Sequence, residues 1–123
     1  MNAARYTVEL AKTMDAEVVL MHSFGGIPAA LAEKGDEIAQ KLTEEAGELL
    51  EPYRELFRRG GVRFTEKIIQ GKAGDAIVGL AEDEDCDIIV IGSRGLSNLE
   101  RILLGSVTTR VVQMASCPVL VIR

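Results

Sequence analysis

The stretch that decides the fold reads Asp87-Ile-Ile-Val-Ile91 followed by Gly92-Ser-Arg-Gly-Leu-Ser-Asn-Leu-Glu-Arg-Ile-Leu-Leu-Gly-Ser106. A short apolar run leads into a glycine-rich loop, and an amphipathic segment, Val107 to Ala115, follows it. This order predicts a buried strand, a loop and a helix. Such a strand, ending in a glycine-rich loop and a helix N-terminus, is typical of a site for a phosphorylated ligand.

The residue types in this loop suit an anion. Glycine has no Cβ, so backbone N–H groups can approach a bulky anion closely and the chain can adopt positive φ. Ser106 lies where the helix should begin, so its hydroxyl can cap the helix or donate to a phosphate. Arg94, between two glycines, can pair with a phosphate. By spacing alone, an ordinary turn explains the glycines equally well.

The spacing of the glycines adds a family resemblance. Two residues separate Gly92 from Gly95, nine separate Gly95 from Gly105, and a serine follows. This pattern resembles the nucleotide-binding signature of the universal stress proteins, in their ATP-binding branch. Other segments are similar to the same family, namely Ala11-Lys12, Glu17-Val-Val-Leu-Met-His22, Gly74-Asp-Ala-Ile-Val78 and Cys117-Pro-Val-Leu-Val-Ile-Arg123. The resemblance therefore covers nearly the whole chain.

The resemblance implies an adenine-nucleotide site on the loop. The resemblance implies that Gly92, Gly95, Gly105 and Ser106 contact the phosphates and the ribose. It also implies that Ile91 lies against the ligand. The expected phosphate donors are backbone N–H groups near the two ends of the loop. The expected cofactor is ATP, with any Mg²⁺ held mainly by the phosphates. The expected cofactor-binding residues are Ile91, Gly92, Ser93, Arg94, Gly95, Gly105, Ser106 and Val107.

Length and charge narrow the class of protein. The 123 residues are enough for one domain, 1–123, and a composition of 47% hydrophobic residues favours a packed globule over disorder. The net charge of −5 argues against broad nucleic-acid binding. No apolar run is long enough to span a bilayer, and the N-terminus lacks the apolar centre of a signal peptide. We therefore expect a cytoplasmic protein that binds neither nucleic acid nor membrane.

Helical and strand patterns alternate along the chain. The expected helices are 2–14, 33–59, 75–84 and 106–115, and the expected strands are 17–23, 62–70, 87–92 and 118–122. This order predicts an α/β, Rossmann-like (adenine nucleotide alpha hydrolase-like) fold, with an open parallel sheet and helices on both faces. Pro52 should kink or break the second helix. The expected apolar face of that helix is Ile38, Leu42, Ala46, Leu49, Tyr53 and Leu56.

The chain opens on a helix, whereas the universal stress proteins begin with a buried strand whose aspartate helps to hold adenosine. In the family's strand order 3-2-1-4-5 that strand is central, and the sequence shows no counterpart of it. The edges of 17–23 and 87–92 would then face a gap, with costly unpaired backbone groups. These edges can pair directly, receive a strand from another copy, or stay open in a marginally stable chain. We expect direct pairing, and hence the order 62–70, 17–23, 87–92, 118–122.

Few residues indicate catalysis. His22, the only histidine, lies at the carboxyl end of a strand where ligands sit in such folds, but a lone histidine more often satisfies a local hydrogen bond. Cys86 and Cys117 have no CxxC spacing, so buried free thiols are expected rather than a disulfide or a metal site. Because no general base is evident near the loop, we expect at most slow ATP hydrolysis and no catalytic residue.

The final strand indicates a partner. No helix follows the apolar run Val119-Leu-Val-Ile122, so it should form an open sheet edge. The resemblance implies a homodimer in which this strand pairs with its twofold mate. The expected function is a dimeric stress-response module that binds ATP or a related adenine nucleotide. The alternative is a nucleotide-free dimeric interaction or assembly protein with the same fold.

Overall fold

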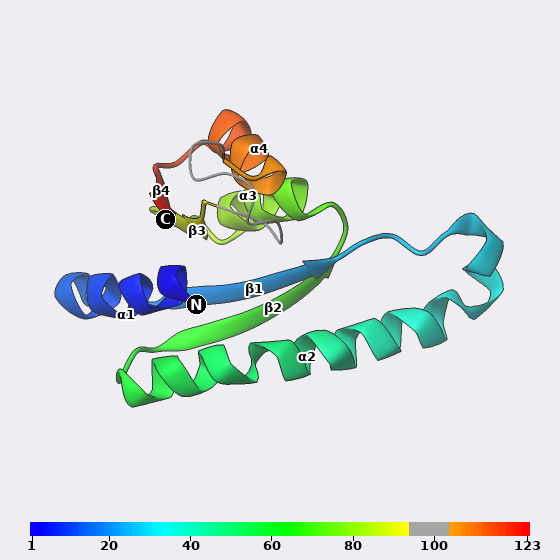
Figure 1. Ribbon diagram of the computed structural model, residues 1–123, viewed down its shortest axis with the longest axis horizontal. Coiled ribbons are helices and arrows are strands. Elements are labelled where there is room, and N and C mark those ends of the chain that lie inside the picture. The colour runs from blue at the N-terminus through cyan, green and yellow to red at the C-terminus, as the bar shows by residue number, and fades with distance from the viewer. Residues whose placement is uncertain (94–103) are drawn as a thin grey trace.

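The computed structural model describes residues 1–93 and 104–123, and Figure 1 shows the arrangement of their elements. Arg94 and Gly95, both predicted site residues, lie outside the described residues. The elements are α1 (Asn2–Met14), β1 (Val18–Phe24), the 3₁₀ helix η1 (Ala29–Lys34), α2 (Gly35–Arg59), β2 (Phe64–Gln70), α3 (Ala73–Asp83), β3 (Ile89–Gly92), α4 (Ser106–Met114) and β4 (Val119–Ile122). Each predicted helix and strand is therefore present, with bounds within two residues of those expected.

Parallel pairing is confirmed, but the strands form two separate pairs. β1 pairs with β2, with Val18 opposite Phe64, and β3 pairs with β4, with Ile89 opposite Val119. Within the described residues no ladder joins β1 to β3, so the expected direct pairing of these two strands is wrong. α1 packs against β3 and β4, and α3 packs against β1, so helix packing rather than a strand ladder connects the two pairs of strands.

The apolar core is divided in the same way. One cluster consists of Ala4, Val8, Ala11, Phe57 and Val62. The other consists of Ala81, Ile89 and Val111. The two clusters share no residue, although a domain usually has one contiguous core. Both the sheet and the core are thus interrupted between the α1–β1–α2–β2 part of the chain and the α3–β3–α4–β4 part, which Figure 1 shows one above the other.

α2 covers the first pair of strands with most of the predicted face, because Ala46 is buried and Ile38, Leu42, Tyr53 and Leu56 are half-buried. Its buried residues are Ala46, Leu50 and Phe57, whereas Leu49, expected inside, is 60% exposed. The helix continues through Pro52, so a break there is excluded. Proline removes a single amide donor, and buried side chains before and after it keep the helix on the sheet.

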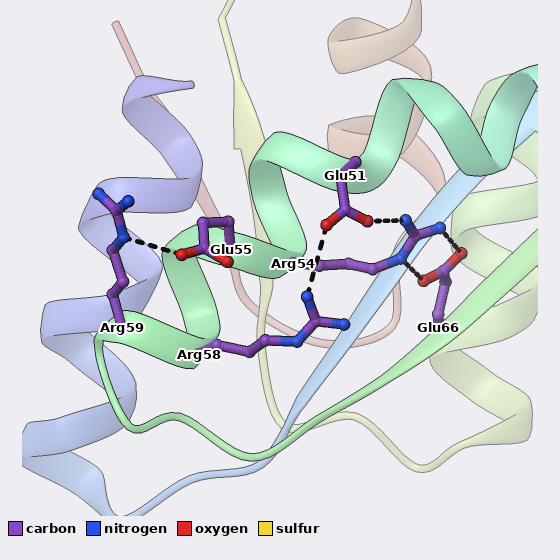
Figure 2. Close-up of polar contacts among 6 residues, drawn as sticks. All are labelled: Glu51, Arg54, Glu55, Arg58, Arg59 and Glu66. Atoms are coloured by element: carbon purple, nitrogen blue, oxygen red, sulfur yellow. Dashed lines mark hydrogen bonds and ion pairs between the residues drawn. The ribbon is translucent and has the colours of Figure 1, made fainter.

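An ion-pair network fastens α2 to β2, as Figure 2 shows. The Arg54 guanidinium is bidentate to Glu66, with Nη2 donating to Oε1 at 2.7 Å, and its Nη1 donates to Glu51 at 2.6 Å. The Arg54 side chain is 18% exposed and that of Glu66 is 24% exposed. Hydrogen bonding to Arg54 lowers the pKa of Glu66, and the two carboxylates raise the pKa of Arg54.

Candidate functional site at the start of α4

Hydrogen bonds hold the start of α4 against the carboxyl ends of β3 and β4. The amide of Gly105 donates to the carbonyl of Ser93 at 2.7 Å, and the amide of Ser93 donates to the carbonyl of Ile122 at 2.8 Å. The hydroxyl of Thr108, a residue only 3% exposed, donates to the carbonyl of Gly92 at 2.6 Å. The two flanks of the glycine-rich loop therefore meet at the edge where ligands of parallel sheets bind.

The glycines contribute space rather than an unusual backbone conformation. Neither Gly92 nor Gly105 has a positive φ, and Gly105 is the N-cap of α4 with φ −61°. A Cβ at Gly92 would meet no atom within 4 Å. The freedom of glycine to adopt positive φ is therefore not used at these two residues, and the open space beside Gly92 leaves room for a ligand.

Ser106 is the first residue of α4, and it does not cap the helix. Its hydroxyl makes no capping hydrogen bond, and the residue is exposed. The amides of Ser93 and Gly105 were expected to donate to phosphate, but both donate to protein carbonyls. Since the first N–H groups of a helix lack intrahelical partners, the amides of Ser106, Val107 and Thr108 are the donors at this end.

An open pocket of about 410 Å³ lies between the start of α3 and the start of α4. Its lining residues are Lys72, Ala73, Gly74, Asp75, Ser106, Val107 and Arg110. Of the predicted site residues, it brings together Ser106 and Val107. Ile91 and Gly92 lie nearby at the end of β3 but do not line it. The pocket thus combines a helix N-terminus, a hydroxyl and two cationic side chains.

Sequence reasoning missed the contribution of α3 to this pocket. Asp75 lies within the first turn of α3, whose N-cap is Lys72. The Asp75 carboxylate accepts from Nε of Arg110 on α4 at 3.1 Å. The four-residue spacing from Ser106 places Arg110 on the same face of α4, and this spacing could have indicated it. No local pattern indicates that α3 begins beside that face.

Gly74 permits the close approach of the two helices. A Cβ at this position would lie 2.6 Å from Cγ and 2.9 Å from Cβ of Arg110. Distances this short cannot be accommodated without a shift of one helix or of the arginine stem. The width of the pocket between α3 and α4 therefore depends on a glycine at this position.

Other titratable groups give no sign of catalysis. Among residues 1–93 and 104–123, no group of three or more His, Cys, Asp or Glu residues is placed to hold a metal. Cys86 and Cys117 are free, half-buried thiols. Burial raises the pKa of the Cys86 thiol, and Cys117 and nearby carboxylates raise it further, so Cys86 is a poor nucleophile at neutral pH. None of the described helices has the length and apolarity needed to cross a membrane.

Comparison with known proteins decides the family. The sequence model of the Universal stress protein family matches residues 1–123. This chain belongs to the universal stress protein family. Universal stress protein MJ0531 of Methanocaldococcus jannaschii is 37% identical to it over 128 residues, a match that covers 100% of this chain and 74% of that protein.

Solved structures agree with this assignment. The structure described as hypothetical protein MJ0577 is 34% identical, with a TM-score of 0.80 over 98% of this chain and 88% of that one. The universal stress protein from Archaeoglobus fulgidus in complex with dAMP is 26% identical, with a TM-score of 0.73 over 99% of this chain and 86% of that one. These likenesses confirm the predicted α/β, Rossmann-like fold of this universal stress protein. They also show that the family contains members that bind an adenine nucleotide.

Proposed function

We propose that this universal stress protein binds ATP or a related adenine nucleotide at the start of α4 and acts as a cytoplasmic, dimeric stress-response module. One observation carries the proposal. The exposed Ser106 hydroxyl and the amides of the first turn of α4 lie at the carboxyl end of β3, beside a pocket that contains Lys72 and Arg110. Each of these groups is suited to an anionic ligand.

The roles of the residues follow from their positions. The phosphates would accept from the amides of Ser106 and Val107 and from the Ser106 hydroxyl, while Lys72 contributes a positive charge. The N-terminal end of α4 adds about 0.3–1 kcal/mol of favourable field at an exposed site. Ile91 and the open space at Gly92 would face the nucleoside side. The dAMP complex of the Archaeoglobus fulgidus relative supports the adenine assignment.

Hydrolysis would be slow in this arrangement. Among the described residues that line the pocket, Asp75 has the only carboxylate, and it pairs with Arg110. A carboxylate held in an ion pair is a weak general base, so the described residues favour binding over turnover. Mg²⁺ would be held mainly by the phosphates of the nucleotide.

Thermal melting with and without Mg-ATP tests the nucleotide site. Ligand at 100 times its Kd should stabilise the protein by about 2.7 kcal/mol. Ser106→Ala should weaken binding about tenfold or more, because it removes one hydrogen bond to a charged group. Ser116→Ala, an exposed serine beyond the other end of α4, is the matched control and should leave the affinity unchanged.

Two results would count against this proposal. If millimolar Mg-ATP leaves the melting temperature unchanged, the alternative of a nucleotide-free interaction protein is favoured. If Ser106→Ala and Ser116→Ala weaken binding equally, the nucleotide binds elsewhere on the chain.

A further inference from the structure

The fold brings the two cysteines of the chain together at the amino ends of β3 and β4. Cys86 comes three residues before β3, which begins at Ile89. Cys117 comes two residues before β4, which begins at Val119. The two strands are parallel neighbours, with Ile89 opposite Val119. Continued backwards, this register sets Asp87 opposite Cys117, so Cys86 lies one residue out of register with Cys117.

This spacing suits a disulfide. Neighbouring strands lie about 4.8 Å apart and one residue advances about 3.3 Å, so one step out of register separates two Cα atoms by about 6 Å. Disulfides usually join Cα atoms that are about 4.4–6.8 Å apart. The Ile89 amide donates to the Pro118 carbonyl at 2.9 Å and so joins the two segments next to both cysteines.

Both cysteine side chains pack against the same apolar cluster. This cluster consists of Ala81, Ile89 and Val111, and both cysteines are half-buried against it. The Cys86 amide donates to the Ala81 carbonyl at 2.9 Å, which holds Cys86 close to the end of α3. Three residues offer a small surface, so two side chains that both touch it lie near each other. The thiols are thus neighbours in the fold, although the whole of α4 lies between them in the sequence.

The surroundings of the two thiols give them different reactivity. Burial raises the pKa of the Cys86 thiol, and Cys117 and three carboxylates raise it further, those of Glu84, Asp87 and Asp85. A thiol with a raised pKa is mostly protonated at neutral pH and attacks slowly. No charged residue lies within three positions of Cys117 in the sequence. Cys117 is therefore the better attacking thiol, and Cys86 is suited to a second, intramolecular attack.

We propose that Cys86 and Cys117 form a reversible disulfide within one chain when the surrounding pool of small thiols becomes oxidised. The oxidant is a small disulfide such as glutathione disulfide. The Cys117 thiolate attacks one of its sulfur atoms, forms a mixed disulfide and releases one glutathione thiolate. The Cys86 thiolate then attacks the Cys117 sulfur, forms the protein disulfide and releases the second glutathione. Two electrons pass to glutathione disulfide, and the two thiol protons end on the two glutathione molecules.

The bridge would join the α3 and α4 segments at the ends remote from the pocket. α3 ends at Asp83 and α4 ends at Met114, each three residues before a cysteine, whereas the pocket lies between the starts of the same helices. The bridge would also close a loop that contains the whole of α4. It would therefore constrain the α3–β3–α4–β4 part of the chain and leave the α1–β1–α2–β2 part unchanged.

Equilibration with glutathione tests this proposal on the chain of residues 1–123. The protein is held in mixtures of reduced and oxidised glutathione, its free thiols are alkylated, and it is digested with trypsin without reduction. Trypsin separates the Cys86 peptide, 73–94, from the Cys117 peptide, 111–123, and we expect mass spectrometry to find them joined. The ratio of bridged to reduced protein should be about tenfold higher or more in the folded protein than in concentrated urea, because the fold holds the two thiols together.

Two single variants test the order of attack. Cys86→Ser keeps the attacking thiol and lacks the second one, so it should accumulate glutathione on Cys117. Cys117→Ser should accumulate glutathione on Cys86 several times more slowly, because that thiol is more fully protonated. Thermal melting under reducing conditions shows whether each variant is folded. The bridging test uses the unchanged protein, so it does not depend on the folding of either variant.

Several outcomes would overturn the proposal. One is the absence of the joined peptide at saturating glutathione disulfide. Another is a bridged fraction no higher in the folded protein than in urea. A third is a joined peptide that is found only in disulfide-linked dimers on a non-reducing gel. Faster modification of Cys86 than of Cys117 in the single variants would overturn the order of attack. The readout uses no nucleotide, so its failure and the failure of the nucleotide test are independent.

Discussion

At the scale of single residues, the site depends on a few close approaches. Thr108 and Gly105 bring the start of α4 onto the end of β3, and Gly74 lets α3 approach α4. These positions act through geometry, because none of them carries a charge. Their substitution should therefore change the shape of the pocket and leave its charged groups unchanged.

Two glycines of α3 make a matched pair that tests whether Gly74 permits the close approach of α3 to α4. Gly74→Ala places a methyl group against Arg110 and should lower the free energy of unfolding by about 1–3 kcal/mol through overpacking. Gly79→Ala meets no atom within 4 Å and should raise it by about 0.8–1 kcal/mol through helix propensity. Urea unfolding of both variants measures the difference. Equal effects of the two substitutions would show that α3 and α4 are not in close contact.

At the scale of elements, the tie between α2 and β2 is electrostatic as well as apolar. Arg54 reaches from the helix to Glu66 on the strand with two hydrogen bonds (Figure 2). The exposed pair of Arg59 and Glu55 lies within α2 alone, and such surface pairs contribute little. The first pair therefore holds the helix to its sheet, and the second does not.

The Arg54–Glu66 pair predicts a pH dependence. The pKa of Glu66 is lower in the folded state than its ordinary value of 4.5, so ionised Glu66 stabilises the fold. This contribution is fully present above about pH 5 and is lost as pH falls through the folded-state pKa. The free energy of unfolding of Glu66→Gln should thus be lower than that of the unchanged protein at pH 6. This difference in stability should become smaller toward pH 3. Urea midpoints at both pH values test this, with Glu55→Gln as a control expected to show little gap at either.

At the scale of the whole molecule, the outer edge of β4 is the expected dimer contact. The carbonyls of Pro118 and Ile122 accept from β3, so the alternation directs the backbone of Val119 and Val121 outward. The antiparallel approach of a twofold mate would pair these groups.

Light scattering should give a mass about twice 13.3 kDa at micromolar concentration. Val121→Pro removes an outward donor without breaking the β3 ladder and should produce monomers, whereas Val121→Ala should remain dimeric. A monomeric mass for the unchanged protein would contradict the proposed dimer.

The sequence predicts most elements because their signals are local. Apolar spacing located α1 at residues 2–14, and the glycine spacing located the start of α4 at Ser106. In α2 the same reasoning placed Leu49 on the buried face, whereas Leu50 is buried and Leu49 is exposed. Both residues fit a helical apolar stripe, and only the surface against which the helix packs decides which of them is buried.

What could not be predicted depends on distant contacts. The two pairs of strands are connected through helix packing, which no local pattern in the sequence indicates. For the same reason only part of the pocket lining could be predicted. Ser106 and Val107 belong to a recognisable loop, whereas Lys72 and Arg110 line the pocket only because α3 and α4 meet. Ser106 does not cap α4, because the helix begins at Ser106 itself and Gly105 is its N-cap.

The divided core bears on the cooperativity of unfolding. Since the two clusters share no residue, their coupling depends on the contacts of α1 with β3 and β4 and of α3 with β1. The chain then behaves as two weakly coupled folding units, and heat would unfold them in overlapping steps rather than in one all-or-none transition.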